Sequence, residues 1–210
     1  MYLLATVPHG HCPTEKTRRC DLRATEVSKL LVKLLKRKKI KYDVVTTHTN
    51  RALVDLNRPK PILYRSMHKR RNSKRHTNSK TLKKYHHALD IWNSFNTRII
   101  EKLKTHEHRI LLDIHSFNLG SFGNAHIVIL DLNKEHREEL DKFAEIASLW
   151  LNIKVQVLDG GINYIQDTYR RLAYPILLEF CEDASVLPPE TISRFFKLLL
   201  EYLEPIAKKF

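Results

Sequence analysis

Short apolar runs alternate along this chain with longer stretches that have helical spacing. The runs at 2–7 and 42–48 are rich in apolar and β-branched residues, so they predict strands. Runs of the same character are RILLDIH at 109–115, AHIVILDL at 125–132, KVQVLD at 154–159 and YPILLEF at 174–180. We therefore expect these segments to form the strands of one sheet.

Amphipathic stretches fill the intervals between these runs. One helix is predicted over 21–38, and others over about 82–103 and 135–151. The apolar positions of the first are Leu22, Val27, Leu30, Leu31, Leu34 and Leu35. A last helix is predicted from about Pro189 to Lys208, because proline suits a first turn and FFKLLLEYL supplies an apolar stripe.

The alternation of strands and helices predicts an α/β fold with a central, mostly parallel or mixed sheet and helices on both faces. A chain of 210 residues with 42% hydrophobic residues can bury one sizeable core. Neither a repeat nor a linker divides it, so one domain over 1–210 is expected. In such sheets, ligands bind beyond the carboxyl ends of the strands.

Side chains capable of chemistry follow several of the predicted strands. They are His9 and His11, the stretch 48–58, the group Asp113, His115 and Ser116, and Glu179. Each has a structural interpretation, since a single histidine is usually a packed residue and a carboxylate can cap a turn or pair with a cation. Together, histidines and carboxylates are typical of catalytic zinc, where three protein ligands leave one position open.

The ordered motifs TVPHGH, NRALVDLNRP, LLDIHS, DGGINYI and ILLEF resemble the N-formylglutamate amidohydrolase family. An acidic residue, Asp21, follows the first motif by about a dozen positions, as in that family. The motifs span Val7 to about Glu182, which is most of the chain. The family is distantly similar to the zinc carboxypeptidases. The resemblance therefore implies their mixed α/β fold and a zinc-dependent hydrolase of amide bonds.

The resemblance also implies a ligand set for one zinc ion. His9 matches the histidine of the family's Pro-His motif, Asp21 its acidic ligand, and His115 the histidine of Asp-x-His-Ser. Spacing alone leaves His11 and Glu15 open as competing ligands. Asp113 lies two residues before His115 and is expected to support the site or the structure rather than to bind zinc.

The resemblance assigns the proton transfers to Glu179, which matches the acidic residue of a late strand in carboxypeptidase-like enzymes. It would take a proton from water and deliver it to the leaving nitrogen. Arg58, in VDLNR, is the candidate for holding a substrate carboxylate or the developing oxyanion. Asn57 would align it, and Arg51 is the fallback.

Two further residues are candidate substrate contacts, namely Ser116 and Tyr164. Tyr164 lies in DGGINYIQDTYRR, at 159–171, which predicts a Gly-Gly turn before a tyrosine-bearing segment or, alternatively, a hairpin-like turn between two strands. The family's Gly-Asp and Gly-Thr stretches are replaced here by HIVILDLNKEHREE, and a basic segment follows DLNR. Because both changes fall where substrates are selected, we expect a substrate other than N-formylglutamate.

The formal net charge of +14 is concentrated in part of the chain. No acidic residue occurs from 59 to 87, whereas ten lysines and arginines do. A basic loop or arm at about 60–84 is predicted, which would solubilise the chain, attract an acidic small-molecule or peptide substrate, or bind a polyanion such as nucleic acid. The alternative function is therefore a polyanion-binding protein on a catalytically retired hydrolase fold.

The expected setting is cytoplasmic, without a membrane partner. The sequence has no apolar run of the length that spans a bilayer, and its first residues have no signal-peptide character. Three cysteines, an odd number, argue against a disulfide framework.

Overall fold

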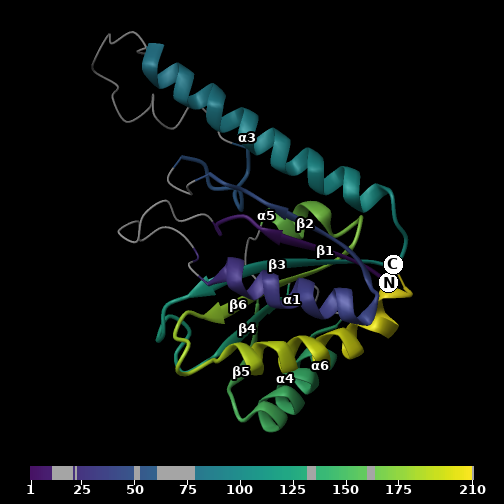
Figure 1. Cartoon of the computed structure of the whole chain (residues 1–210). Coiled ribbons are helices and arrows are strands. Elements are labelled where there is room, and N and C mark those ends of the chain that lie inside the picture. Colours follow the sequence, from purple (N-terminus) through teal and green to yellow (C-terminus); the bar gives the residue numbers. More distant parts are fainter. Residues whose placement is uncertain are drawn as a thin grey trace.

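The computed structural model describes residues 1–10, 21, 23–49, 53–60, 79–131, 136–159 and 164–209. Within them, six strands form one sheet in the order β2-β1-β3-β6-β4-β5 (Figure 1). The strands are β1 (Tyr2–Val7), β2 (Lys41–Thr46), β3 (Arg109–Phe117), β4 (Ile127–Asp131), β5 (Val155–Asp159) and β6 (Tyr174–Cys181).

The sheet is mixed. β1 pairs in parallel with both β2 and β3, and β3 pairs in parallel with β6. β4 runs antiparallel to β6, and β5 is parallel to β4. The carboxyl ends of β1, β3 and β6 therefore meet at one edge of the sheet, which is the edge where the sequence predicts a site.

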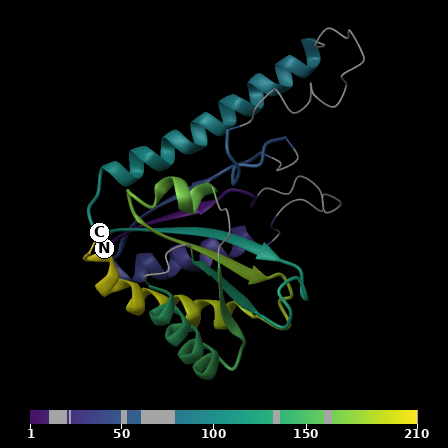
Figure 2. The same ribbon diagram turned by 180° about the vertical axis from the view of Figure 1, so that it is seen from behind.

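Helices cover both faces of the sheet, as predicted (Figures 1 and 2). Their bounds are α1 (Ala24–Lys38), α3 (Ser79–Lys104), α4 (Arg137–Leu151), α5 (Tyr164–Tyr169) and α6 (Pro189–Ala207). One apolar layer packs beneath α1, α4 and α6, and a second packs beneath α3 and α5. The predicted α/β architecture with a mixed sheet is thus confirmed.

Strand alternation decides which side chain enters which layer. On β1, Leu3 and Ala5 join the layer of α1 and α6, whereas Tyr2 and Leu4 join the layer of α3. The same alternation on β3 directs Leu111 toward α3, and it puts Asp113 and His115 on that face as well. His115 therefore lies on the α3 and α5 face of the sheet.

The segment after β5 differs from the hairpin alternative. Residues 164–169 form the short helix α5, and β6 then pairs with β3 and β4 rather than with β5. The hairpin-like turn is therefore wrong, because β4 lies between β5 and β6 in the sheet.

Several sequence predictions fall outside the described residues. These are Arg51, His11, Glu15 and residues 61–78 of the predicted basic arm. The last residues of that arm, 79–84, form the first turns of α3, and Lys83 and Lys84 are exposed there. No helix in the described residues has the length and apolar character needed to cross a lipid bilayer.

A buried arginine ties the start of α1 to the segment that follows β6. Arg23 is 4% exposed, and its guanidinium donates hydrogen bonds to the carbonyls of Cys181 (3.0 Å), Asp183 (3.3 Å) and Leu187. The fork of donors on an arginine suits several carbonyls at once. This contact fixes the position from which α1 begins, three residues after Asp21.

Candidate metal centre

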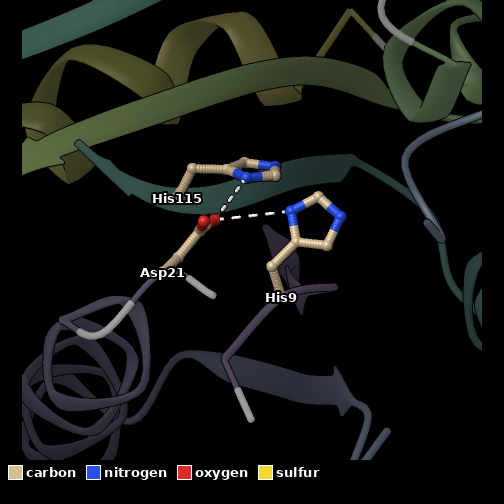
Figure 3. A group of neighbouring side chains, drawn as sticks. All are labelled: His9, Asp21 and His115. Atoms are coloured by element: carbon tan, nitrogen blue, oxygen red, sulfur yellow. Dashed lines mark hydrogen bonds and ion pairs between the residues drawn. The ribbon is translucent and has the colours of Figure 1, made fainter. Parts of the chain in front are cut away.

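Three buried side chains from separate parts of the chain meet at the carboxyl edge of the sheet (Figure 3). His9 follows β1, Asp21 precedes α1, and His115 lies near the end of β3. Asp21 Oδ2 is 2.7 Å from His115 Nδ1 and 3.5 Å from His9 Nδ1. Figure 3 shows the Asp21 carboxylate in contact with both imidazole rings, whose centroids are 5.1 Å apart.

Backbone contacts bring His9 and Asp21 together. The Asp21 N–H donates to the carbonyl of His9 at 3.1 Å, and the Thr25 hydroxyl donates to the carbonyl of Gly10 at 2.8 Å. A Cβ atom at Gly10 would lie 2.5 Å from Thr25 Oγ1, so only glycine permits this approach. This close packing explains why the last residue of the Pro-His-Gly motif is glycine.

The outer nitrogen of each histidine faces a second carboxylate. His9 Nε2 lies 2.8 Å from Asp55 Oδ1, and His115 Nε2 lies 3.0 Å from Asp113 Oδ2. The Thr6 hydroxyl donates to the other oxygen of Asp113 at 2.7 Å. Histidines that bind metals commonly donate their second N–H to a carboxylate, which fixes the ring and leaves the other nitrogen free to coordinate.

Asp55 reaches the site because of the pattern in VDLNR. Val54 and Leu56 are buried in the layer beneath α3. The residues between and after them, Asp55 and Asn57, are partly buried and contact the two histidines. The side-chain amide of Asn57 is 3.3 Å from His115 Nε2, and its oxygen accepts from the N–H of Ile165 in α5 at 3.4 Å.

This group carries an excess of negative charge. With neutral imidazoles, the carboxylates of Asp21, Asp55 and Asp113 leave three negative charges around two histidines. Burying such charge is costly unless cations or hydrogen bonds compensate it. Two protons on the histidines, or one divalent cation bound by neutral histidines, would each remove two of those charges.

The electrostatics of the chain without metal follow from this excess. Burial lowers the pKa of His115, but the charge and hydrogen bond of Asp113, the hydrogen bond of Asp21 and the charge of Glu179 raise it well above its usual range. Burial raises the pKa of Asp21, but the two histidines lower it more, so its pKa falls far below the usual range. In this state the surroundings favour the ionised form of Asp21 and the protonated form of His115.

The residues present fit a metal ion. His9 Nδ1 is buried and has no hydrogen bond from any described residue, although it points at the carboxylate of Asp21. One ligand atom from each of His9, Asp21 and His115 lies within 4.8 Å of the others. Two imidazoles and a carboxylate are ligands that suit Zn²⁺ and other divalent transition metals. The three residues could therefore hold a metal ion.

Two other predicted residues lie beside this group. Glu179 on β6 is the register neighbour of His115 on β3, and paired residues of adjacent strands point to the same face, about 4.8 Å apart. Arg58 has a side chain that is 62% exposed, with its Nε 3.7 Å from Asp55 Oδ2. The structure thus brings both residues to the same edge of the sheet as the histidines.

Tyr164 stands at the first position of α5 and contacts Trp92 of α3, with ring centroids 5.5 Å apart. The indole N–H of Trp92 donates to the carbonyl of Arg58 at 3.0 Å. These contacts connect Tyr164 to the loop that carries Arg58.

Ser116 does not join the group. It follows His115 on β3 and so points to the opposite face of the sheet. There it accepts a hydrogen bond from the N–H of Arg23 at 3.3 Å and donates one to Glu182 at 2.8 Å. Its contacts support the start of α1 rather than the surroundings of the histidines.

Sequence reasoning missed the roles of Asp55, Thr6 and Trp92. The alternation of Val54 and Leu56 was a usable signal for Asp55, because it puts Asp55 and Asn57 on the side away from the core. The pairing of Asp113 with His115 follows from their spacing of two on a strand, which leaves both on one face. Nothing local in the sequence marks Thr6 or Trp92.

Comparisons with solved structures agree with the fold. The crystal structure of gene product Atu2144 from Agrobacterium tumefaciens superposes with a TM-score of 0.65 at 16% identity, over 99% of this chain and 90% of that one. The CwlD amidase from Clostridioides difficile, in its complex with the GerS lipoprotein, gives a TM-score of 0.52 at 14% identity, over 97% of this chain and 98% of that one. No protein-family model and no curated protein sequence matches the chain.

The charge of the site predicts how stability changes with pH in chelator-treated protein. The raised pKa of His115 means that its contribution is fully present below about pH 6.5, the usual histidine value, and is lost as the pH rises toward the raised value. Above pH 6.5 the free energy of unfolding should therefore fall, by up to about 1.4 kcal/mol per pH unit.

Thermal unfolding from pH 6 to 9 measures this, with His115→Gln as the matched control that lacks the titrating group. Wild type should lose stability relative to the variant as the pH rises. Adding Zn²⁺ should reverse the trend, because metal binding requires neutral imidazoles. Parallel pH profiles for the two metal-free proteins would contradict the assigned protonation of His115.

Proposed function

We propose that this chain is a zinc-dependent hydrolase that cleaves an amide bond of an acidic substrate, such as an acyl-amino acid or an acidic peptide. The observation that carries the proposal is the pairing of both histidines, each with one nitrogen toward Asp21 and the other against a separate carboxylate. This much buried negative charge favours either protonated histidines or one bound divalent cation. A purely structural cluster has no requirement for two histidines oriented in this way.

His9, Asp21 and His115 would hold the zinc ion. Zinc, when bound, supplies Lewis acidity toward water and toward an amide carbonyl. Asp55 and Asp113 keep the two rings in the orientation that binding needs, and Thr6 fixes Asp113 in turn. Three protein ligands are the number found in catalytic rather than closed structural zinc sites.

Glu179 is the proposed general base and acid. Its carboxylate takes a proton from the attacking water and then delivers that proton to the amide nitrogen, which is otherwise a poor leaving group. Its position supports this role, since it neighbours His115 in the sheet, shares its face and is partly exposed. The charge of Glu179 also contributes to the raised pKa of His115, which indicates that the two groups are close.

Arg58 is the proposed recognition residue for a carboxylate of the substrate or for the oxyanion. A guanidinium binds such groups through two parallel hydrogen bonds. Asn57 and the contact of Trp92 with the Arg58 carbonyl hold the loop in place, and Tyr164 adds an aromatic ring beside it. Arg51, of the same sequence motif, remains a predicted further contact.

The reaction class has two additional supports. The fold is shared with a protein described as an amidase, and the motifs resemble those of N-formylglutamate amidohydrolases. The basic segment at 60–84 directly follows the loop of Arg58, which favours an acidic substrate by charge. The family's Gly-Asp and Gly-Thr stretches are absent from this chain. We therefore propose a related amide hydrolysis, with a substrate other than N-formylglutamate.

Removing the proton carrier tests the mechanism. Glu179→Gln should lower kcat on an N-acyl-glutamate by about 100- to 10,000-fold, the usual contribution of a general acid-base group. Its zinc content should stay that of the wild type, because Glu179 is outside the ligand set. Initial-rate assays of amide cleavage measure kcat, and elemental analysis of the same samples measures the zinc content. Full activity of Glu179→Gln would contradict the assigned role.

A substrate pair tests Arg58. Arg58→Gln should lower kcat/KM for an N-acyl-glutamate by roughly 10- to 100-fold, because a charge-assisted hydrogen bond contributes about 1.5 to 3 kcal/mol. The corresponding N-acyl-glutamine lacks the carboxylate and should lose much less. Equal losses for the two substrates would instead point to stabilisation of the oxyanion by Arg58.

A further inference from the structure

The exposed side of α1 carries a dense row of cations. Seven lysines and arginines lie between 27 and 42, and no acidic residue does. They are Lys29, Lys33, Lys36, Arg37, Lys38, Lys39 and Lys41, and all of them are exposed. The spacing of the first four, at i, i+4, i+7 and i+8, puts them on one face of the helix.

Most of the cations on α1 form no ion pair with the part of the chain that the structure describes. Lys38 pairs with Glu201 at 3.5 Å. Lys29, Lys33, Lys36 and Arg37 have no ion pair with any described residue. Glu26, the acidic residue of the first turn, pairs with the buried Arg23 at 3.5 Å.

The neighbouring helix extends this basic surface. α6 packs beside α1 (Figures 1 and 2), and a shallow groove of about 560 Å³ runs between them. Lys33 and Arg37 line one wall of this groove, and Arg194 lines the other, with Glu190 as the acidic member. The groove lies on the face of the sheet opposite to that of α3 and α5, away from the histidines.

We propose that this surface, defined by Lys29, Lys33, Lys36, Arg37 and Arg194, binds the phosphate backbone of double-stranded nucleic acid. Rows of exposed lysine and arginine bind phosphates without regard to sequence and release counterions when they do so. From Lys29 to Arg37 the helix rises about 12 Å, at about 1.5 Å per residue, which matches a short stretch of duplex backbone. This inference is independent of the proposed amide hydrolysis.

Two other anionic partners fit less well. A membrane-binding helix adds large exposed apolar residues to its basic face, but the exposed ones of the described chain are Leu53, Leu82, Leu119, Ile146, Leu149 and Trp150, none of them on α1 or α6. Single-stranded nucleic acid is held largely by stacking on exposed aromatic rings. α1 has no aromatic residue. Of the aromatic residues of α6, Phe195 and Phe196 are buried, and Tyr202 is partly buried against the core.

The test is fluorescence anisotropy with a labelled DNA duplex of about 20 base pairs, titrated from 50 to 200 mM salt. The full chain should bind, with an affinity that falls steeply as salt rises. The triple variant Lys29→Gln, Lys33→Gln, Arg37→Gln should bind at least ten times more weakly at 100 mM salt. Its slope of log affinity against log salt should be shallower by about three, since each lost phosphate contact removes about one.

The matched control removes the same charge elsewhere, as Lys104→Gln, Lys142→Gln, Lys154→Gln, all exposed positions outside α1 and α6. This control should keep most of the wild-type affinity. Equal binding by wild type and the α1 variant would overturn the proposal. The affinity for duplex DNA would then be assigned to the segment 60–84. Binding to vesicles of anionic lipid without binding to duplex would overturn it as well. Hydrolysis of a small acyl-amino acid should be the same in all three proteins.

Discussion

The interaction on which this structure depends is a buried row of alternating carboxylates and imidazoles, running from Asp55 through His9, Asp21 and His115 to Asp113. With neutral imidazoles the row carries three negative charges, and two protons or one divalent cation would remove two of them. Every member comes from a different strand end, loop or helix start, except the His115 and Asp113 pair on β3. The requirement to compensate this charge therefore couples the fold of four separate segments to the chemistry that they can perform.

The rest of the fold acts as a support for that row. Parallel pairing of β1, β3 and β6 brings their carboxyl ends together, which lines up His9, His115 and Glu179. Buried Val54 and Leu56 hold the loop that presents Asp55 and Asn57, and Arg23 anchors the helix that begins just after Asp21. Arg58 and Glu179, for which we propose recognition and proton transfer, lie at this same edge of the sheet.

Much of this organisation could be predicted from local pattern. Apolar runs predicted the strands, and amphipathic spacing predicted the long helices. Both predictions are possible because strands and helices bury their side chains with different periods along the sequence. The convergence of His9 and His115 followed from the sheet rule for strand ends. The helix α5 was not predicted, because its six residues, Tyr164–Tyr169, resemble a turn segment. The supporting position of Asp113 could be expected from its spacing of two from His115 on a strand. The contact of Asp55 with His9 was missed because the two residues are far apart in the sequence and meet only in the folded chain.

The basic face of α1 and the histidine cluster lie on opposite sides of one sheet, so binding of a polyanion and hydrolysis of an amide need not compete for residues. The central claim, however, is that the charged row holds a metal. Anomalous X-ray scattering from crystals of zinc-supplemented protein, collected on either side of the zinc edge, tests it most directly. We predict one strong peak between His9 Nδ1, Asp21 and His115. A peak elsewhere, or none at full zinc supplementation, would contradict the account.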